Sequence, residues 1–291
     1  PVMEGKAVLF RKFAHIDVFD IEVQADTPQA FIDTVIRIAP TFGGINLEDI
    51  AAPHCFEIEQ ALSEQLDIPI FHDDQHGTAI IIAAGLLNAL EIQGECLETA
   101  RIVCLGAGAA GMASMNLLLA LGAKKENILM VDRTGVIHDH RNNLNIYKKV
   151  FANTTDKRSL ADAMEDANIF IGVSGANLVD EDMIESMAPN PIVFALSNPD
   201  PEISPGVAFS VRDDLIMATG RSDYPNQINN VLGFPYVFRG ALDVRASCIN
   251  LEMQMAAVHA LQSLAHERVP QSVLQAYGLK SLSFGEHYII P

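Results

Sequence analysis

The chain has 291 residues, a length that favours about two domains. Hydrophobic residues make up 49% and charged residues 19%, so the chain can bury a sizeable core and is not disordered throughout. The 19 basic residues against 37 acidic ones give a net charge of −18, so neither nucleic acid nor an anionic membrane is an expected partner.

No uncharged apolar run reaches the roughly 18 residues that a membrane-spanning helix needs. The four cysteines are widely scattered and form no CxxC pair, so neither a zinc ribbon nor a redox dithiol is expected. We expect reduced thiols in a cytoplasmic protein. The cysteines are Cys55, Cys96, Cys104 and Cys248.

The first quarter of the chain mixes short apolar runs with helical spacing. The runs at 7–10 and 18–21 predict strands. Thr27 followed by Pro28 is typical of a helix start and predicts a helix to about Ile38. Further along, we expect a helix over 55–66, an extended run over 68–71 and a buried helix over 78–90.

From residue 102 onward, apolar strands alternate with helices, which predicts a doubly wound parallel sheet covered on both faces. The expected strands lie at 102–105, 128–131, 169–173, 192–195 and 215–218. The expected helices lie at 112–121, 144–151, 159–164, 180–187 and 247–266. The change of rhythm puts a domain boundary near residue 76.

A GxGxxG sequence joins the first of these strands to its helix, from Gly106 to Gly111. An acid, Asp132, ends the next strand 21 residues after Gly111, and this context is what a dinucleotide-binding turn requires. Gly106 permits the tight turn, Gly108 lets the backbone approach the pyrophosphate, and Gly111 lets helix and strand pack closely. The alternative is a glycine turn in a Rossmann-like sheet that binds nothing.

The same strand end leaves the choice of cofactor open. Asp132 would accept a hydrogen bond from a ribose hydroxyl and favours NAD. Arg133 could meet a 2′-phosphate and favours NADP.

Two acidic pairs, Glu48-Asp49 and Asp73-Asp74, each sit beside apolar residues. Carboxylates at strand ends next to a nucleotide-binding fold suggest a site for Mg²⁺ or Mn²⁺. The alternative is a set of solvated loop acids. His72 and His76 have the spacing of a zinc pair, but no third soft ligand is apparent, so we favour packing or supporting roles for them.

Two asparagine-containing segments, 196–199 and 227–230, follow or precede buried runs. Ligands of open α/β sheets bind at the carboxyl ends of strands, and an Asn amide can bind a carboxylate without adding charge. The alternative is that these asparagines only form turns.

Five of these segments occur together in one enzyme family. They are residues 43–50, 71–79, 104–111, 194–199 and Asn229-Asn230. In this combination the chain resembles the malic enzymes over essentially its whole length, and most of all the bacterial NADP-dependent type. The resemblance implies oxidative decarboxylation of L-malate to pyruvate and CO₂, with reduction of NADP⁺ or NAD⁺ and a requirement for Mg²⁺ or Mn²⁺.

The resemblance also implies roles for single residues. Glu48, Asp49 and Asp74 would bind the metal, Lys6 would be the general base, and Asp73 would lie beside both. The implied substrate residues are Asn198, Asn229 and Asn230. The implied cofactor residues are Thr78, Gly106, Ala107, Gly108, Ala109, Ala110, Gly111, Asp132, Arg133, Ser174 and Asn198.

By the same resemblance, residues 1–76 are the last part of a smaller N-terminal α/β domain, and 77–291 are a Rossmann-like domain with closing helices. The family protonates C3 with a Tyr upstream of the Lys, and this chain has no Tyr before Tyr147. We therefore expect a fragment without the proton donor and without a phosphotransacetylase-like domain, and a homo-oligomer for the complete protein. A dehydrogenase without decarboxylation, and a non-catalytic nucleotide-binding module, are the alternatives.

Overall fold

A six-stranded sheet with the order β5-β4-β3-β6-β7-β8 organises most of this computed structural model, which describes residues 2–291. The strands are β3 (Ile102–Leu105), β4 (Ile128–Asp132), β5 (Gly135–Val136), β6 (Ile169–Gly172), β7 (Ile192–Ala195) and β8 (Ile216–Thr219). All pairs are parallel except β4 with β5. The strand order reverses direction at β3, and this is where open α/β sheets bind ligands. The predicted doubly wound fold is confirmed.

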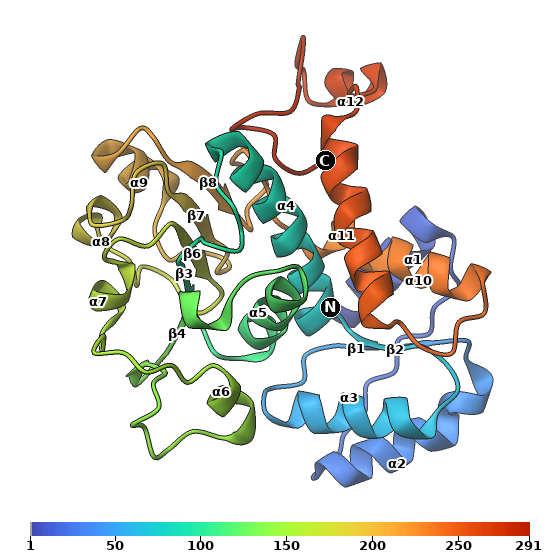
Figure 1. The fold of residues 1–291 in the computed structure, drawn as a ribbon. Helices are drawn as coiled ribbons and strands as arrows, with labels where there is room; N and C mark the ends of the chain where they lie inside the picture. Colours follow the sequence, from blue (N-terminus) through green and yellow to red (C-terminus); the bar gives the residue numbers. More distant parts are fainter. Residues whose placement is uncertain (1) are drawn as a thin grey trace.

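Both faces of this sheet are covered because successive side chains of a strand point to opposite sides. Ile102 and Cys104 join the core formed with α4 (Thr78–Gln93), α5 (Ala109–Ala120) and α11 (Leu251–His266). Val103 and Leu105 join a second core, on the side of α7 (Leu160–Met164), α8 (Glu181–Glu185) and α9 (Pro205–Val211). Figure 1 shows these two layers of helices on either side of the strands.

A smaller unit precedes α4 and has its own core. The strands β1 (Ile45–Leu47) and β2 (Ile70–His72) pair in parallel, and α2 (Pro28–Ile38) and α3 (His54–Gln65) pack beside them. Thr27 caps α2, since its side-chain oxygen accepts a hydrogen bond from the Ala30 amide at 3.2 Å. The parallel pairing puts the carboxyl ends of β1 and β2 together.

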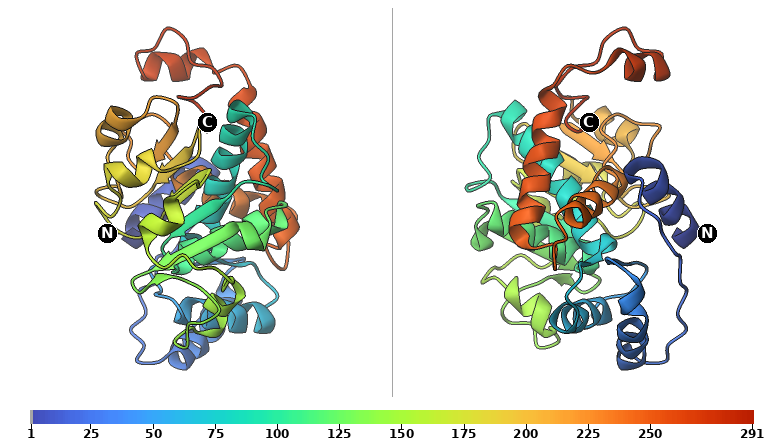
Figure 2. Two further views of the ribbon diagram at one scale, coloured as in Figure 1. Left: turned by 60° about the vertical axis from the view of Figure 1, so that its left-hand side comes forward. Right: turned by 90° about the vertical axis from the view of Figure 1, so that its right-hand side faces the viewer.

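The first helix, α1 (Val2–Ala14), leaves this unit and docks on α10 (Phe234–Asp243). The Phe10 ring packs edge-on against Phe234 and Phe238, with centroid distances of 4.8 and 5.3 Å. The connection from α1 to α2 is a long extended segment along the outside of the molecule (Figure 2). The first helix of the chain thereby meets a helix that lies more than 200 residues further along it.

The predicted strands at 7–10 and 18–21 are wrong. Residues 7–10 lie inside α1, where Phe10 is buried and Val8 is exposed, because so short an apolar run fits one side of a helix as well as a strand. Residues 18–21 belong to the extended connection and form no ladder with any described strand. The closing helix predicted from Ser247 begins at Leu251, where the Asn250 side chain caps it.

The remaining predicted elements are confirmed to within a few residues, including α6 (Ile146–Val150). Four elements were not predicted: β5, α9, α10 and α12 (Gln271–Ala276). The short helical turns are η1 (Ala39–Thr41), η2 (Asp73–Gly77), η3 (Lys125–Asn127) and η4 (Asn230–Leu232). All four cysteines are free. Within residues 2–291, no helix has the length and apolar character needed to cross a membrane.

Candidate active site

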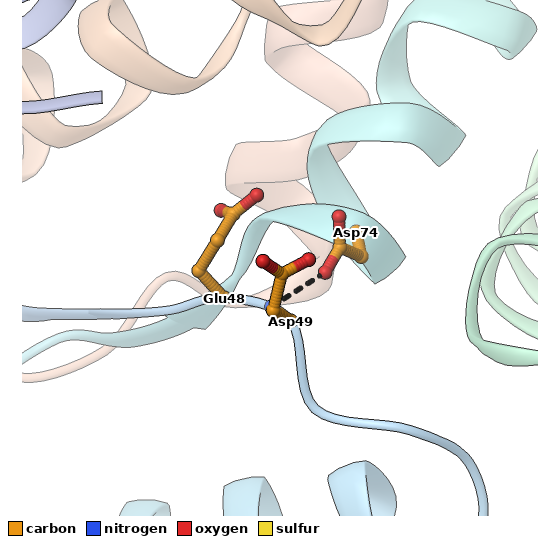
Figure 3. A group of neighbouring side chains, drawn as sticks. All are labelled: Glu48, Asp49 and Asp74. Carbon is orange, nitrogen blue, oxygen red and sulfur yellow. Dashed lines mark hydrogen bonds between the residues drawn. The ribbon is translucent and has the colours of Figure 1, made fainter. Parts of the chain in front are cut away.

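An acidic cluster forms where β1 and β2 end. Glu48 and Asp49 follow β1, and Asp74 lies in η2, directly after β2. Carboxylate oxygens of the three residues lie within 4.8 Å of one another, and the Asp49 amide donates a hydrogen bond to Asp74 Oδ2 at 3.0 Å. Figure 3 shows the three side chains converging. Asp49 has a positive φ of 56°, a backbone conformation that is uncommon for non-glycine residues and that concentrates at functional sites.

The acidic cluster fits a hard divalent cation. Its donors are all carboxylate oxygens, which Mg²⁺ and Mn²⁺ prefer. The pKa of Glu48 is raised to about 7, mainly by burial; Lys6 opposes this rise, and the neighbouring carboxylates of Asp74 and Asp73 contribute to it. A cation in the middle of these acids would remove that repulsion. Among the described residues, Glu48, Asp49 and Asp74 are the one group of three possible ligands that lie close enough to share a metal ion, and the group includes neither His72 nor His76.

Lys6 reaches this cluster from α1. Its ammonium group donates a hydrogen bond to Asp73 Oδ2 and lies 3.4 Å from Glu48 Oε1. It also sits over the Phe234 ring, 4.3 Å from the centroid. Lys6 and Phe10 are four residues apart and share one face of α1, so the docking of Phe10 on α10 directs Lys6 inward.

Asp73 connects the lysine to the second half of the chain. Asp73 is fully buried. Burial raises the pKa of its carboxyl group to about 6, although Lys6 acts in the opposite direction. Asn230 donates from Nδ2 to the same Asp73 Oδ2 at 2.8 Å. The other oxygen, Oδ1, is buried without a hydrogen-bond partner in the structure. Lys6, Glu48, Asp73 and Asn230, predicted from four separate segments, are thus in one network beside a cavity of about 740 Å³ that Lys6, Glu48 and Asp49 line.

Glu59, on α3, holds η2 in place and was not predicted. Its carboxylate accepts hydrogen bonds from the His72 amide at 3.3 Å and from Gln75 Nε2 at 3.0 Å. It also pairs with His76 Nε2 at 2.7 Å. A lone acid on an amphipathic helix gives no spacing signal, so only the fold reveals this contact.

The glycine turn between β3 and α5 is built for close approach. Gly106 has φ of +118°, and a Cβ there would lie 2.7 Å from the Val173 carbonyl oxygen. A Cβ on Gly111 would lie 1.9 Å from the Gly106 oxygen. A Cβ on Gly108 would meet nothing within 4 Å, so the space in front of it is open to a ligand. The free amides at the start of α5 are suited to a pyrophosphate, and η2 packs against this helix.

Gly111→Ala and Gly108→Ala are expected to separate folding from binding. The first adds a methyl group against rigid backbone, so it should destabilise the fold by about 1–3 kcal/mol and also weaken cofactor binding. The second should leave the melting temperature unchanged and weaken only binding, because it fills the open space. Thermal unfolding and titration with NADPH measure the two effects. An unaltered melting temperature for Gly111→Ala would contradict the packing described above.

Asp132 does not stand free at the end of β4. Both of its carboxylate oxygens accept hydrogen bonds from Arg141, at 2.9 and 3.1 Å, and Lys148 Nζ donates to Oδ2 at 2.6 Å. These two cations hold the pKa of the Asp132 carboxyl group well below its usual range, although its partial burial acts in the opposite direction. Asp132 is thus already engaged within the chain, and its role as an acceptor for a ribose hydroxyl stays a prediction. Arg133 is exposed.

The other predicted residues lie at the start of α4 and in the segments that follow β6, β7 and β8. Thr78 begins α4 directly after η2, and Ser174 follows β6. Asn198 follows β7, and its Nδ2 would lie 2.7 Å from a Cβ added to Gly220. Asn229 is occupied as a cap, since its Oδ1 accepts a hydrogen bond from the Val231 amide at 3.0 Å. No contact joins Ser174 or Asn198 to the acidic cluster among the described residues.

Two family domains match the chain in succession. Residues 1–63 match the malic enzyme N-terminal domain, and residues 75–277 match the malic enzyme NAD binding domain. The chain belongs to the malic enzyme family. The resemblance found in the sequence is confirmed, together with the Rossmann-like fold.

The sequences of individual malic enzymes align with the whole of this chain. The NADP-dependent malic enzyme of Halomonas elongata is 66% identical over 291 residues, which are 69% of its length. The NADP-dependent enzyme of Escherichia coli is 55% identical, and the NAD-dependent enzyme of Rhizobium meliloti is 52% identical. The chain spans only 39% and 38% of the lengths of these last two.

Solved structures of the family have the same fold. The malic enzyme of Pyrococcus horikoshii matches with a TM-score of 0.89 at 43% identity, covering all of this chain and 66% of that one. The NAD-dependent malic enzyme of Thermotoga maritima matches with a TM-score of 0.89 at 41% identity, covering all of this chain and 73% of that one. Relatives of both cofactor types are therefore close, so similarity alone does not select NAD or NADP.

Proposed function

We propose that this chain carries the metal and cofactor sites of an enzyme that oxidises and decarboxylates L-malate to pyruvate and CO₂, with reduction of NADP⁺. One observation carries the proposal: a partly buried lysine, Lys6, is held by Asp73 and Glu48 at the edge of the acidic cluster, and η2, which carries Asp74, packs against α5, the helix that follows the dinucleotide turn. The names of the relatives, NADP-dependent malic enzymes among them, support the same reaction.

Within this proposal the residues have separate tasks. Glu48, Asp49 and Asp74 would hold Mg²⁺ or Mn²⁺, which when bound draws electrons from the C2 oxygen of malate. Lys6 takes the proton of the C2 hydroxyl as the C2 hydride passes to the nicotinamide ring. Asp73 and Asn230 keep the Lys6 amine directed at that oxygen. The carboxylate on C3 then leaves as CO₂ and its bonding electrons move toward C2; C3 afterwards takes a proton, for which the resemblance implies a Tyr side chain as the donor.

The cations at the end of β4 support NADP over NAD. Arg141 and Lys148 neutralise Asp132, so a 2′-phosphate would meet two positive side chains rather than a free carboxylate. The Lys148 side chain is 25% exposed and the Arg141 side chain 9%, so Lys148 is the more accessible of the two. Arg133, the residue predicted for this task, is exposed next to them.

Lys148→Ala is expected to raise the KM for NADP⁺ about tenfold and to leave the KM for NAD⁺ nearly unchanged, because it removes one charge-assisted hydrogen bond to phosphate. Lys149→Ala is the matched control, since Lys149 is the exposed neighbour on the same helix. Steady-state kinetics with both cofactors measure the change. An equal rise in KM for NAD⁺ and NADP⁺ would show that Lys148 does not bind the 2′-phosphate.

The products distinguish the proposed reaction from its alternatives. Two proteins are assayed. One is the chain alone, and the other is the Halomonas elongata relative in which this chain replaces the aligned region. We expect equal amounts of CO₂ and reduced cofactor from malate. Reduced cofactor without CO₂ would identify a plain dehydrogenase. Cofactor binding without turnover in both proteins would identify a non-catalytic nucleotide-binding module.

A further inference from the structure

A second fully buried carboxylate, besides Asp73, lies among the described residues. It is Glu202, in the loop between β7 and α9, and its exposed fraction is 0%. Burial raises the pKa of its carboxyl group, and backbone amides oppose this rise. Burying a carboxylate is unfavourable unless hydrogen bonds compensate it, so its contacts are informative.

The two oxygens of Glu202 join two different loops. Oε1 accepts a hydrogen bond from the Ser174 amide at 2.9 Å, in the loop after β6. Oε2 accepts one from the Ser197 amide at 3.1 Å, in the loop after β7. The Glu202 backbone adds a third tie, because its carbonyl oxygen accepts from the Val179 amide at 3.0 Å. Glu202 therefore ties together the loops that follow β6 and β7.

The sheet makes room for this side chain. Gly172 is the last residue of β6, and a Cβ there would lie 2.4 Å from Glu202 Cδ and 2.7 Å from Oε2. A larger residue at 172 would expel the carboxylate from its position. The bridge between the two loops thus depends on a glycine in the strand as well as on the acid.

The bridged loops face the cofactor site. The glycine turn after β3 serves the first half of a Rossmann sheet, and the loops after β6 and β7 serve the second half, where the other nucleotide binds. The loop after β6 touches the glycine turn, since a Cβ on Gly106 would lie 2.7 Å from the Val173 oxygen. Ser174, a predicted cofactor residue, donates its amide to Glu202, and Asn198 directly follows Ser197.

We propose that Glu202 is a positioning residue for the nicotinamide half of the cofactor. Its carboxylate holds the Ser174 loop and the Ser197-Asn198 loop at the separation that the bound dinucleotide requires, without touching the dinucleotide itself. The inference rests on the proposed function in one respect, namely that NAD(P) binds across these loops.

Glu202→Gln tests this role. Glutamine keeps the size of the side chain but replaces one acceptor oxygen with an amide NH₂ group, which only donates, so one of the two backbone amides loses its acceptor. We expect faster hydrogen exchange in the peptides that contain Ser174 and Ser197, measured without cofactor. We also expect the Kd for NADPH to rise about tenfold, because a buried donor is left unpaired in the loops that bind it. Affinity for Mn²⁺ should stay the same, because the acidic cluster shares no contact with Glu202.

Asp214→Asn is the matched control. Asp214 accepts a hydrogen bond from the Asn190 amide at 2.8 Å and pairs with Arg212, but it lies before β8, at the amino ends of the strands, whereas Glu202 joins loops at their carboxyl ends. This variant should lower the melting temperature and leave the NADPH Kd unchanged. Glu202→Asp, which keeps the charge but is one methylene shorter, is measured in parallel and should weaken NADPH binding while Mn²⁺ still binds.

Unchanged hydrogen exchange in Glu202→Gln would show that Glu202 does not hold the two loops together. An unchanged Kd for NADPH would show that Glu202 has no role in cofactor binding. An equal weakening of NADPH binding in Asp214→Asn would also overturn it, because the effect would then follow from stability alone. If the wild-type chain binds no NADPH, the proposed function fails, while the exchange measurement still decides whether Glu202 holds the two loops.

Discussion

Asp74→Ala is expected to abolish Mn²⁺ binding and, with it, the turnover of malate. The substitution removes one of three carboxylates whose oxygens lie within 4.8 Å of one another, and it also removes the acceptor of the Asp49 amide. A divalent cation held by two carboxylates in place of three loses both charge and geometry. Titration of the metal-free protein with Mn²⁺, followed by electron paramagnetic resonance, measures the affinity directly.

Asp67→Ala provides the control for that experiment, because Asp67 is an exposed acid a few residues before the acidic cluster and is not part of it. It should bind Mn²⁺ as the unchanged protein does. Cofactor binding should survive in both variants, since the glycine turn lies on a different strand. Unchanged Mn²⁺ affinity in Asp74→Ala would refute the metal assignment.

Lys6→Arg and Lys6→Ala are expected to lower kcat by about 10²–10⁴-fold while the Kd for NADP⁺ stays the same, because the proposed general base is lost. Arginine keeps the positive charge beside Asp73 and Glu48, but it does not release its proton in proteins. A merely structural role for the charge would therefore let Lys6→Arg keep its activity. Loss of activity in both variants would identify the proton transfer as the missing function.

Lys12→Ala is the matched variant for Lys6, since Lys12 lies on the same helix and is exposed. Its kcat should equal that of the unchanged protein. The measurements are single-turnover malate oxidation and equilibrium binding of NADP⁺. If Lys6→Arg retained most of the wild-type rate, another group would have to be the base.

The larger sheet could be predicted because its strands are buried on both faces and alternate with helices, a pattern that little else produces. The glycine turn could be predicted for a similar reason, since its meaning comes from the strand before it and the acid after it. The acidic pairs in the sequence indicated the residues of the acidic cluster, but not that they come together. That they converge follows from the parallel pairing of β1 with β2, and this pairing was not predicted.

The misassigned and missed features depend on contacts between distant segments. Lys6 reaches Asp73 because Phe10 docks on α10, more than 220 residues away in the chain, and a short apolar run carries no sign of this. The partners of Asp132 lie 9 and 16 residues beyond it, and Glu202 acts through backbone amides that any sequence would supply. The domain boundary near residue 76 stays a prediction.

The most direct test of the proposed function is pyruvate formation from L-malate and NADP⁺ after chelation of divalent metal. The protein is the Halomonas elongata relative that carries this chain in place of its aligned region. We predict no pyruvate in the chelated protein and full recovery when Mn²⁺ is added back, with no recovery in the Asp74→Ala variant. Pyruvate formation that is insensitive to the chelator would contradict the central claim that the acidic cluster is a metal site for this reaction.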